Sequence, residues 1–131
     1  MVYGNFNPYG LTTLPLLFVV TASETLYAGA GALIRNLVPP SRLSFTPGWR
    51  NPIFGGAAIL CTLGYDFVTN IYTGVHWAQI SGSTDYIRWV LVALFNPGAL
   101  FFMAAHVASN FTFFTAFAPA LIKGVGKIKR G

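Results

Sequence analysis

The sequence predicts an all-α, polytopic membrane protein, a single membrane domain over residues 1–131 with three spanning helices and one short interfacial or broken helix. Two observations lead to this prediction. Hydrophobic residues make up 54% of the chain and charged residues only 8%, whereas a soluble domain carries about a quarter charged residues. The apolar residues also form runs long enough to cross roughly 30 Å of hydrocarbon as a helix. This composition excludes a conventional water-soluble globule.

Prolines and polar turns separate the first two helices. The first apolar stretch predicts a helix over about residues 11–37, which ends where two consecutive prolines remove backbone donors. Asn51 and Pro52 then form a pair typical of an N-cap and a first helical turn. They predict the start of a second helix, over about residues 52–77, in which apolar residues recur at helical spacing.

The last third of the chain predicts one short helix and one long helix. Residues 85–95 are apolar, but a helix of this length covers only roughly 16 Å, so it cannot span the bilayer alone. Asn96 and Pro97 interrupt the pattern. The third spanning helix is expected over about residues 98–122, followed by a basic tail over 123–131.

Basic residues predict the orientation of the chain in the membrane. Seven of the eight lie at the end of the first span, in the loop after it and in the tail: Arg35, Arg42, Arg50, Lys123, Lys127, Lys129 and Arg130. Positive charges in short loops favour the cytoplasmic side, and three crossings put both regions on that side. We therefore expect a multi-pass protein of the cell membrane, surrounded by membrane lipid, with a cytoplasmic C-terminus. These charges are too scattered for a nucleic-acid interface, so no nucleic-acid partner is expected.

Motifs for catalysis or cofactor binding are missing from the sequence. Cys61 is the single cysteine, which excludes a disulfide within the chain and a thiolate metal cluster. The chain contains no P-loop, no HExxH motif, no dinucleotide fingerprint and no nucleophile elbow. We expect that the protein is not an enzyme and that it holds neither a metal nor a cofactor.

Polar residues within the apolar helices are the candidate functional residues, because an ionisable side chain at the bilayer centre costs about 2.5–3.5 kcal/mol. Asp66 and Asn70 lie four residues apart on the second helix, so they share one helix face. His106 and Asn110 have the same spacing on the third spanning helix. We predict that the two faces oppose each other and line a ligand-binding pocket. The predicted ligand-binding residues are Tyr65, Asp66, Thr69, Asn70, His106 and Asn110.

Other interpretations of the same residues stay open. Polar side chains often hold membrane helices together, at about 0.6 kcal/mol each, and the chain would then be a non-catalytic accessory or anchor subunit of a larger membrane complex. Such a subunit could also bind haem through His106, with His76 as a second imidazole ligand. Glu24, in the first span, could join the pocket, pair with a basic residue or face a partner chain.

Three strings in the second half of the chain carry a family resemblance. Residues 64–70 read Gly-Tyr-Asp-Phe-Val-Thr-Asn, residues 105–111 read Ala-His-Val-Ala-Ser-Asn-Phe, and residues 118–123 read Ala-Pro-Ala-Leu-Ile-Lys. Over about residues 50–123 the chain resembles the C-terminal half of the substrate-binding S components of energy-coupling factor (ECF) transporters. The strings that carry the resemblance contain YDxxTN and HxxSN.

The resemblance implies an integral membrane component that binds a vitamin or micronutrient for uptake. It also implies two kinds of partner, a transmembrane coupling subunit and cytoplasmic ATPases that hydrolyse the ATP. S components usually have six helices, and the first three have no counterpart in this chain. Self-association or a second membrane chain would therefore have to complete the helical bundle.

Overall fold

The computed structural model describes residues 14–39, 42–43, 48 and 50–128, and this part of the chain is almost entirely helical, without strands. The helices are α2 (Leu14–Leu37), α3 (Asn51–Ile80), α4 (Tyr86–Phe95) and α5 (Pro97–Ile128). Three of them, α2, α3 and α5, are long and apolar enough to cross a membrane, and α4 is the shorter apolar helix. The predicted all-α, multi-pass membrane architecture is confirmed.

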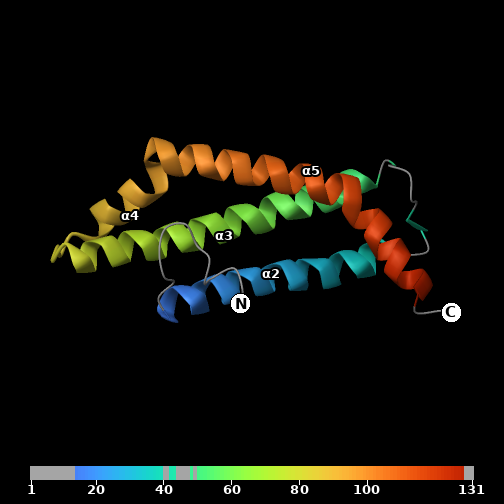
Figure 1. Cartoon of the computed structure of the whole chain (residues 1–131), viewed down its shortest axis with the longest axis horizontal. Helices are drawn as coiled ribbons and strands as arrows, with labels where there is room; N and C mark the ends of the chain where they lie inside the picture. Colours follow the sequence, from blue (N-terminus) through green and yellow to red (C-terminus); the bar gives the residue numbers. More distant parts are fainter. Residues whose placement is uncertain (1–13, 40–41, 44–47, 49, 129–131) are drawn as a thin grey trace.

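The three long helices lie side by side, and α3 contacts each of the other helices. Figure 1 shows that α2 and α5 run in the same direction and α3 runs in the opposite one. The segment after α2 and the C-terminal end of α5 therefore lie at the same end of the bundle. We call this the basic end, because five basic side chains of the described residues belong to it: Arg35, Arg42, Arg50, Lys123 and Lys127.

One asparagine side chain joins the end of α4 to the start of α5. Asn96 closes α4 by donating from its side-chain amide to the carbonyl of Val92 at 3.0 Å. Its Oδ1 also accepts from the backbone N–H of Ala99 at 2.9 Å and so caps the start of α5. Because one side chain satisfies backbone groups at both helix ends, the chain can change direction here without exposing them to lipid.

The fourth helix begins and packs through equally local features. Asp85 accepts from the backbone N–H of Arg88 at 3.1 Å, which is the geometry of an N-cap. Gly74 of α3 is buried against the backbone of α4, and a Cβ atom at this position would collide with Val90. The absence of a side chain at Gly74 is therefore what lets the two backbones approach so closely.

The third span is longer than the sequence predicts. The sequence predicts a helix over about 98–122, but α5 continues through Pro119 to Ile128. Part of the predicted tail, 123–131, is consequently helical. A proline removes one backbone hydrogen bond and favours a kink, and Figure 1 shows that α5 bends in its C-terminal part. Pro119 itself is fully buried, so packing holds the bent helix together.

The ends of the first two spans also differ from the prediction. Residues 11–13 lie outside the described residues, and α2 is described from Leu14. The second span extends to Ile80 instead of ending at 77. Asn51 is the first residue of α3 and not its N-cap; its side-chain amide donates to the carbonyl of Thr115 at 2.8 Å and thus joins the start of α3 to α5.

Candidate functional site

Asp66 and His106 form a close pair between α3 and α5. Asp66 lies midway along the 30 residues of α3, which places it roughly 22 Å from either end of the helix. Its Oδ1 lies 2.9 Å from Nδ1 of His106. The Asp66 side chain is only 3% exposed, whereas that of His106 is 27% exposed. An ionisable pair therefore occupies the middle of the apolar bundle, where isolated charges are costly.

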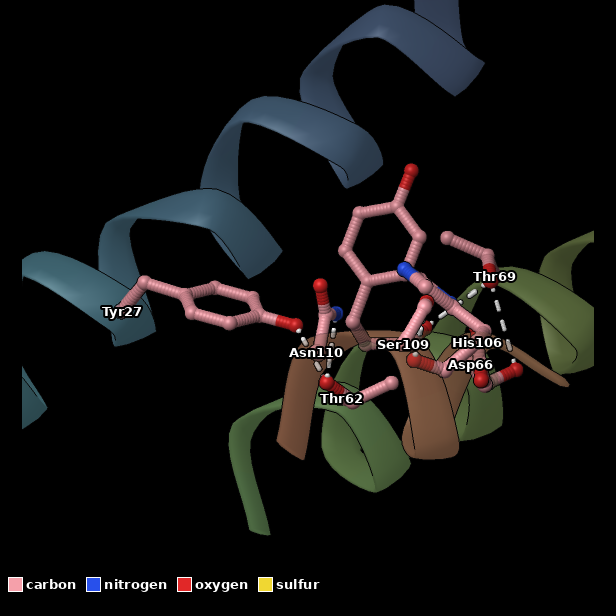
Figure 2. Close-up of polar contacts among 8 residues, drawn as sticks. Tyr27, Thr62, Asp66, Thr69, His106, Ser109 and Asn110 are labelled. Carbon is pink, nitrogen blue, oxygen red and sulfur yellow. Dashed lines mark hydrogen bonds and ion pairs between the residues drawn. The ribbon is translucent and has the colours of Figure 1, made fainter. Parts of the chain in front are cut away.

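Thr62 joins all three candidate spans one turn away from this pair (Figure 2). The side-chain amide of Asn110 donates to Thr62 Oγ1 at 2.9 Å, and the hydroxyl of Tyr27 lies 2.9 Å from the same oxygen. The side chain of Thr62 is fully buried. We call Tyr27, Thr62, Asp66, His106 and Asn110 the polar cluster.

Of the two predicted polar pairs, Asp66, His106 and Asn110 belong to the polar cluster, and Asn70 does not. Within the described chain, the side chain of Asn70 makes no hydrogen bond to the polar cluster. The physical reason is the antiparallel arrangement of α3 and α5. When His106 lies beside Asp66, the residue one turn later on α5 lies beside the residue one turn earlier on α3. Asn110 therefore meets Thr62 and not Asn70, and a role of Asn70 in ligand binding stays a prediction.

The other two predicted site residues lie around the pair without bridging the helices in the same way. The rings of Tyr65 and His106 meet edge to face, with centroids 5.9 Å apart. Phe102 also lies against the imidazole, at 5.6 Å. Thr69 donates its hydroxyl at 2.8 Å to the carbonyl of Tyr65 in its own helix. Tyr65 thus packs against the histidine ring, while Thr69 makes a hydrogen bond to the backbone of its own helix α3.

Two residues of the cluster, Tyr27 and Thr62, are not among the predicted site residues. Thr62 belongs to the same face of α3 as Asp66, four residues earlier. That spacing together with an antiparallel partner is a signal that could have found it. Tyr27 comes from α2, and its ring also stacks on Phe114 of α5 with centroids 6.4 Å apart. No comparable spacing within α2 points to Tyr27.

One oxygen of the buried pair is left without a partner. Oδ2 of Asp66 is inaccessible and makes no hydrogen bond with any described residue. Leaving a buried acceptor unsatisfied costs about 1–3 kcal/mol, and such groups are rare in folded proteins. A ligand N–H or O–H group, or a cationic group, at this oxygen would remove that penalty.

The two histidines do not face each other. His76 stacks on Tyr72, with parallel rings 6.1 Å apart. It lies ten residues beyond Asp66 on α3, roughly 15 Å along the helix axis from the residue that contacts His106. One haem iron cannot reach both imidazoles over that distance. Among the described residues, no group of three or more His, Cys, Asp or Glu side chains gathers in a way that could hold a metal ion.

Comparisons with known proteins leave the chain without a family assignment. No protein-family model matches it, and neither the curated proteins nor the solved structures include a match.

Proposed function

We propose that this chain is the ligand-binding membrane component of an uptake transporter for a vitamin or related micronutrient, similar to the S components of ECF transporters. The observation that carries the proposal is the buried, unpartnered Oδ2 of Asp66 at the middle of α3. A cluster that only held helices together would be expected to satisfy its own acceptors. A buried acceptor without a partner destabilises the fold more than a formed hydrogen bond stabilises it.

The chemistry of the cluster suits a small, polar, partly aromatic ligand. Asp66 would accept from a donor group of the ligand, or balance a positive charge on it. His106 remains 27% exposed, so its ring would offer a second polar contact. Tyr65 and Phe102, which already pack on this imidazole, would give an apolar surface for a flat ligand.

Energy for uptake would come from partner proteins. The sequence carries no P-loop, so in this proposal a transmembrane coupling subunit and cytoplasmic ATPases hydrolyse ATP. A second membrane chain or a second copy would complete the bundle. The basic end would face the cytoplasm, where positive charge accumulates in membrane proteins.

The orientation is tested by labelling single cysteines from each side of sealed vesicles. In a Cys61→Ala background, Arg42→Cys and Lys127→Cys should react with an impermeant reagent only from the cytoplasmic side, and Ser83→Cys only from the other. Reaction of Arg42→Cys and Lys127→Cys from opposite sides would contradict the three-span topology.

Ligand binding is tested by asking which small molecules leave the cell with the protein. The full chain is purified in mild detergent from cells grown in rich medium, and the molecules released on denaturation are identified by mass spectrometry. One compound should accompany the wild type in near-stoichiometric amount. Asp66→Asn and His106→Ala should retain it about 5- to 150-fold more weakly, since each removes one partner of a buried polar contact worth about 1–3 kcal/mol.

Thr112→Ala is the matched control for these variants. Thr112 lies on the same helix as His106 and is exposed, and among the described residues its hydroxyl bonds only the carbonyl of Ala108 one turn earlier. It should therefore retain the compound as the wild type does. If the wild type carries no compound that Asp66→Asn lacks, while all variants insert and fold normally, the cluster is a structural contact and the proposal fails.

A second candidate function is favoured by one observation. Glu24, near the middle of α2, is exposed and makes no hydrogen bond or ion pair with any described residue. A carboxyl group facing lipid at this depth is costly. A non-catalytic accessory subunit that docks α2 against a partner membrane helix would cover it. This function is tested by isolating the tagged chain with its neighbours and asking whether Glu24→Leu loses them.

A further inference from the structure

A cavity of about 520 Å³ lies between α2, α3 and α5, towards the basic end and apart from the Asp66–His106 pair. This volume falls within the range of roughly 300–1,000 Å³ that is usual for ligand pockets. Its wall is almost entirely apolar and includes Ile34, Val38, Phe54, Phe114, Ile122 and Val125. Leu121 and Val125 line it while being 58% and 53% exposed, so the cavity opens to the surrounding bilayer.

The cavity has a closed end and a charged end. Tyr27 lines its inner end, where the ring stacks on Phe114 and the hydroxyl reaches Thr62. Arg35 lines the other end, in the last turn of α2. These two residues are eight apart on one helix, which corresponds to roughly 12 Å along its axis. The apolar depth is thus close to one leaflet, half of a hydrocarbon core of roughly 30 Å.

The charge at the open end has no counter-charge nearby. The three acidic residues of the whole chain are Glu24, Asp66 and Asp85, and none of them lines the cavity or belongs to the basic end. Arg35 is exposed and forms no hydrogen bond or ion pair with a described residue. An anionic group beside the cavity would therefore be attracted by Arg35 and by the other basic residues of this end.

We propose that this cavity binds an anionic phospholipid from the leaflet at the basic end. One acyl chain lies along the apolar wall as far as Tyr27, and the phosphate pairs with the guanidinium of Arg35. The apolar part of the cavity is about as deep as one leaflet, and Arg35 lies where the headgroups would be. A ligand that fits both features is an amphiphile with an anionic head. The lipid site shares Tyr27 with the polar cluster but does not use Asp66 or His106, so it can be tested apart from the proposed uptake function.

The first experiment compares two lipids with the same acyl chains. The full chain in detergent is mixed with phosphatidylglycerol or phosphatidylcholine, and the lipid that stays bound is counted by native mass spectrometry. One phosphatidylglycerol should bind per chain. Arg35→Gln should weaken it about fivefold, since one basic residue near an anionic headgroup is worth about 1 kcal/mol, and should leave phosphatidylcholine unchanged.

Arg88→Gln is the matched control, because it removes the same charge from an exposed residue at the other end of the bundle. It should leave the binding of both lipids as in the wild type. Equal loss of phosphatidylglycerol in Arg35→Gln and Arg88→Gln would show that only net charge matters, and it would overturn the site.

The second experiment fills the cavity. Gly31 lines it, and a Cβ atom there meets nothing within 4 Å, so Gly31→Leu starts a bulky side chain at the cavity wall with room for its first atom. Gly29 is equally unobstructed but does not line the cavity, which makes Gly29→Leu the control. Gly31→Leu should lose most of the bound phosphatidylglycerol and Gly29→Leu none, with the helical circular dichroism of both unchanged. Full retention in Gly31→Leu would refute the proposal, as would a dimer or a copurified protein that excludes lipid from the cavity.

Discussion

The helices α4 and α5 pack against α3 so closely that glycine is required at the contacts, whereas the glycines of α2 lie in open space. Gly55 is buried against Thr115 and Phe111 of α5, and Gly74 is buried against the backbone of α4. A Cβ atom on Gly29 or Gly31 of α2 would meet nothing within 4 Å. Small residues on both sides satisfy the sequence pattern for close helix packing, but among these four only Gly55 and Gly74 of α3 make such contacts.

The polar contacts show the same contrast. α5 shares with α3 the Asp66–His106 pair and the bond from Asn110 to Thr62. α2 buries one residue, Ser23, and reaches α3 through the hydroxyl of Tyr27. The comparison teaches that α5 is joined to α3 by more contacts than α2 is. α2 is attached through Tyr27 and, at its C-terminal end, through Ile34 packed against the Phe54 cluster, and it keeps a large exposed face.

Placing leucine in each region gives the largest expected difference. Gly74→Leu forces a side chain into the backbone of Val90, where the backbone cannot move aside easily. We expect it to lower the free energy of unfolding by about 3 kcal/mol or more, at or above the top of the usual range for overpacking. Gly29→Leu should be within about 0.5 kcal/mol of the wild type, as is usual for exposed positions. Unfolding in mixed micelles titrated with SDS measures both, and equal losses would contradict the contrast.

A double-mutant cycle on the buried pair gives the next largest effect. His106→Leu leaves both carboxyl oxygens of Asp66 buried without a partner, and Asp66→Leu leaves Nδ1 of His106 without its partner. Each should cost about 1–3 kcal/mol, while the double variant should cost less than the sum, because it removes both polar groups together. The same unfolding titration measures the cycle. Additive losses would mean that the 2.9 Å contact contributes nothing of its own.

The fold could be predicted from the sequence because apolar run length and turn residues decide it locally. The break at Asn96 and Pro97 was predictable, since proline disfavours helix in the residue before it. The continuation of α5 through Pro119 was not. A proline ends a helix when nothing compensates for its lost hydrogen bond, and here Pro119 is fully buried within α5. Burial depends on how the helices pack in the bundle, so the local sequence pattern around Pro119 does not predict it.

The candidate site was predictable in part for a similar reason. Spacing by four placed Asp66 and His106 on definite faces of their helices, and the cost of exposing them to lipid predicted that they meet. The register between helices is what spacing alone leaves open. Antiparallel pairing of Asp66 with His106 selects Thr62 over Asn70, and a tyrosine from α2 completes the cluster. Only the assembled bundle decides such contacts.

A smaller effect is expected where α2 meets the cluster. Tyr27→Phe removes the hydroxyl that lies 2.9 Å from Thr62 Oγ1 but keeps the ring that stacks on Phe114. The loss should be about 0.6 kcal/mol, the average for a polar contact between membrane helices. Tyr86→Phe, on the exposed surface of α4, is the control and should cost nothing measurable. A loss from Tyr27→Phe as large as that from His106→Leu would show that α2 is as firmly attached as α5.

The smallest effect on the isolated chain is expected at Glu24, and it decides what α2 is for. This residue is exposed and makes no hydrogen bond or ion pair with the described residues. Glu24→Gln should therefore change the free energy of unfolding of the detergent-solubilised monomer by less than about 0.5 kcal/mol. In the bilayer the same carboxyl group must be covered, because exposing an ionisable group to lipid at this depth costs about 2.5–3.5 kcal/mol.

A partner helix that covers Glu24 would make the substitution visible only in the assembly. Crosslinking in native membranes through a cysteine at Thr21, also exposed and one turn earlier, should give one discrete product in a Cys61→Ala background. Glu24→Leu should abolish that product, since the cost that drives α2 to find a polar partner is gone. An undiminished product with Glu24→Leu would show that the apolar part of the α2 face, and not the carboxyl group, holds the partner.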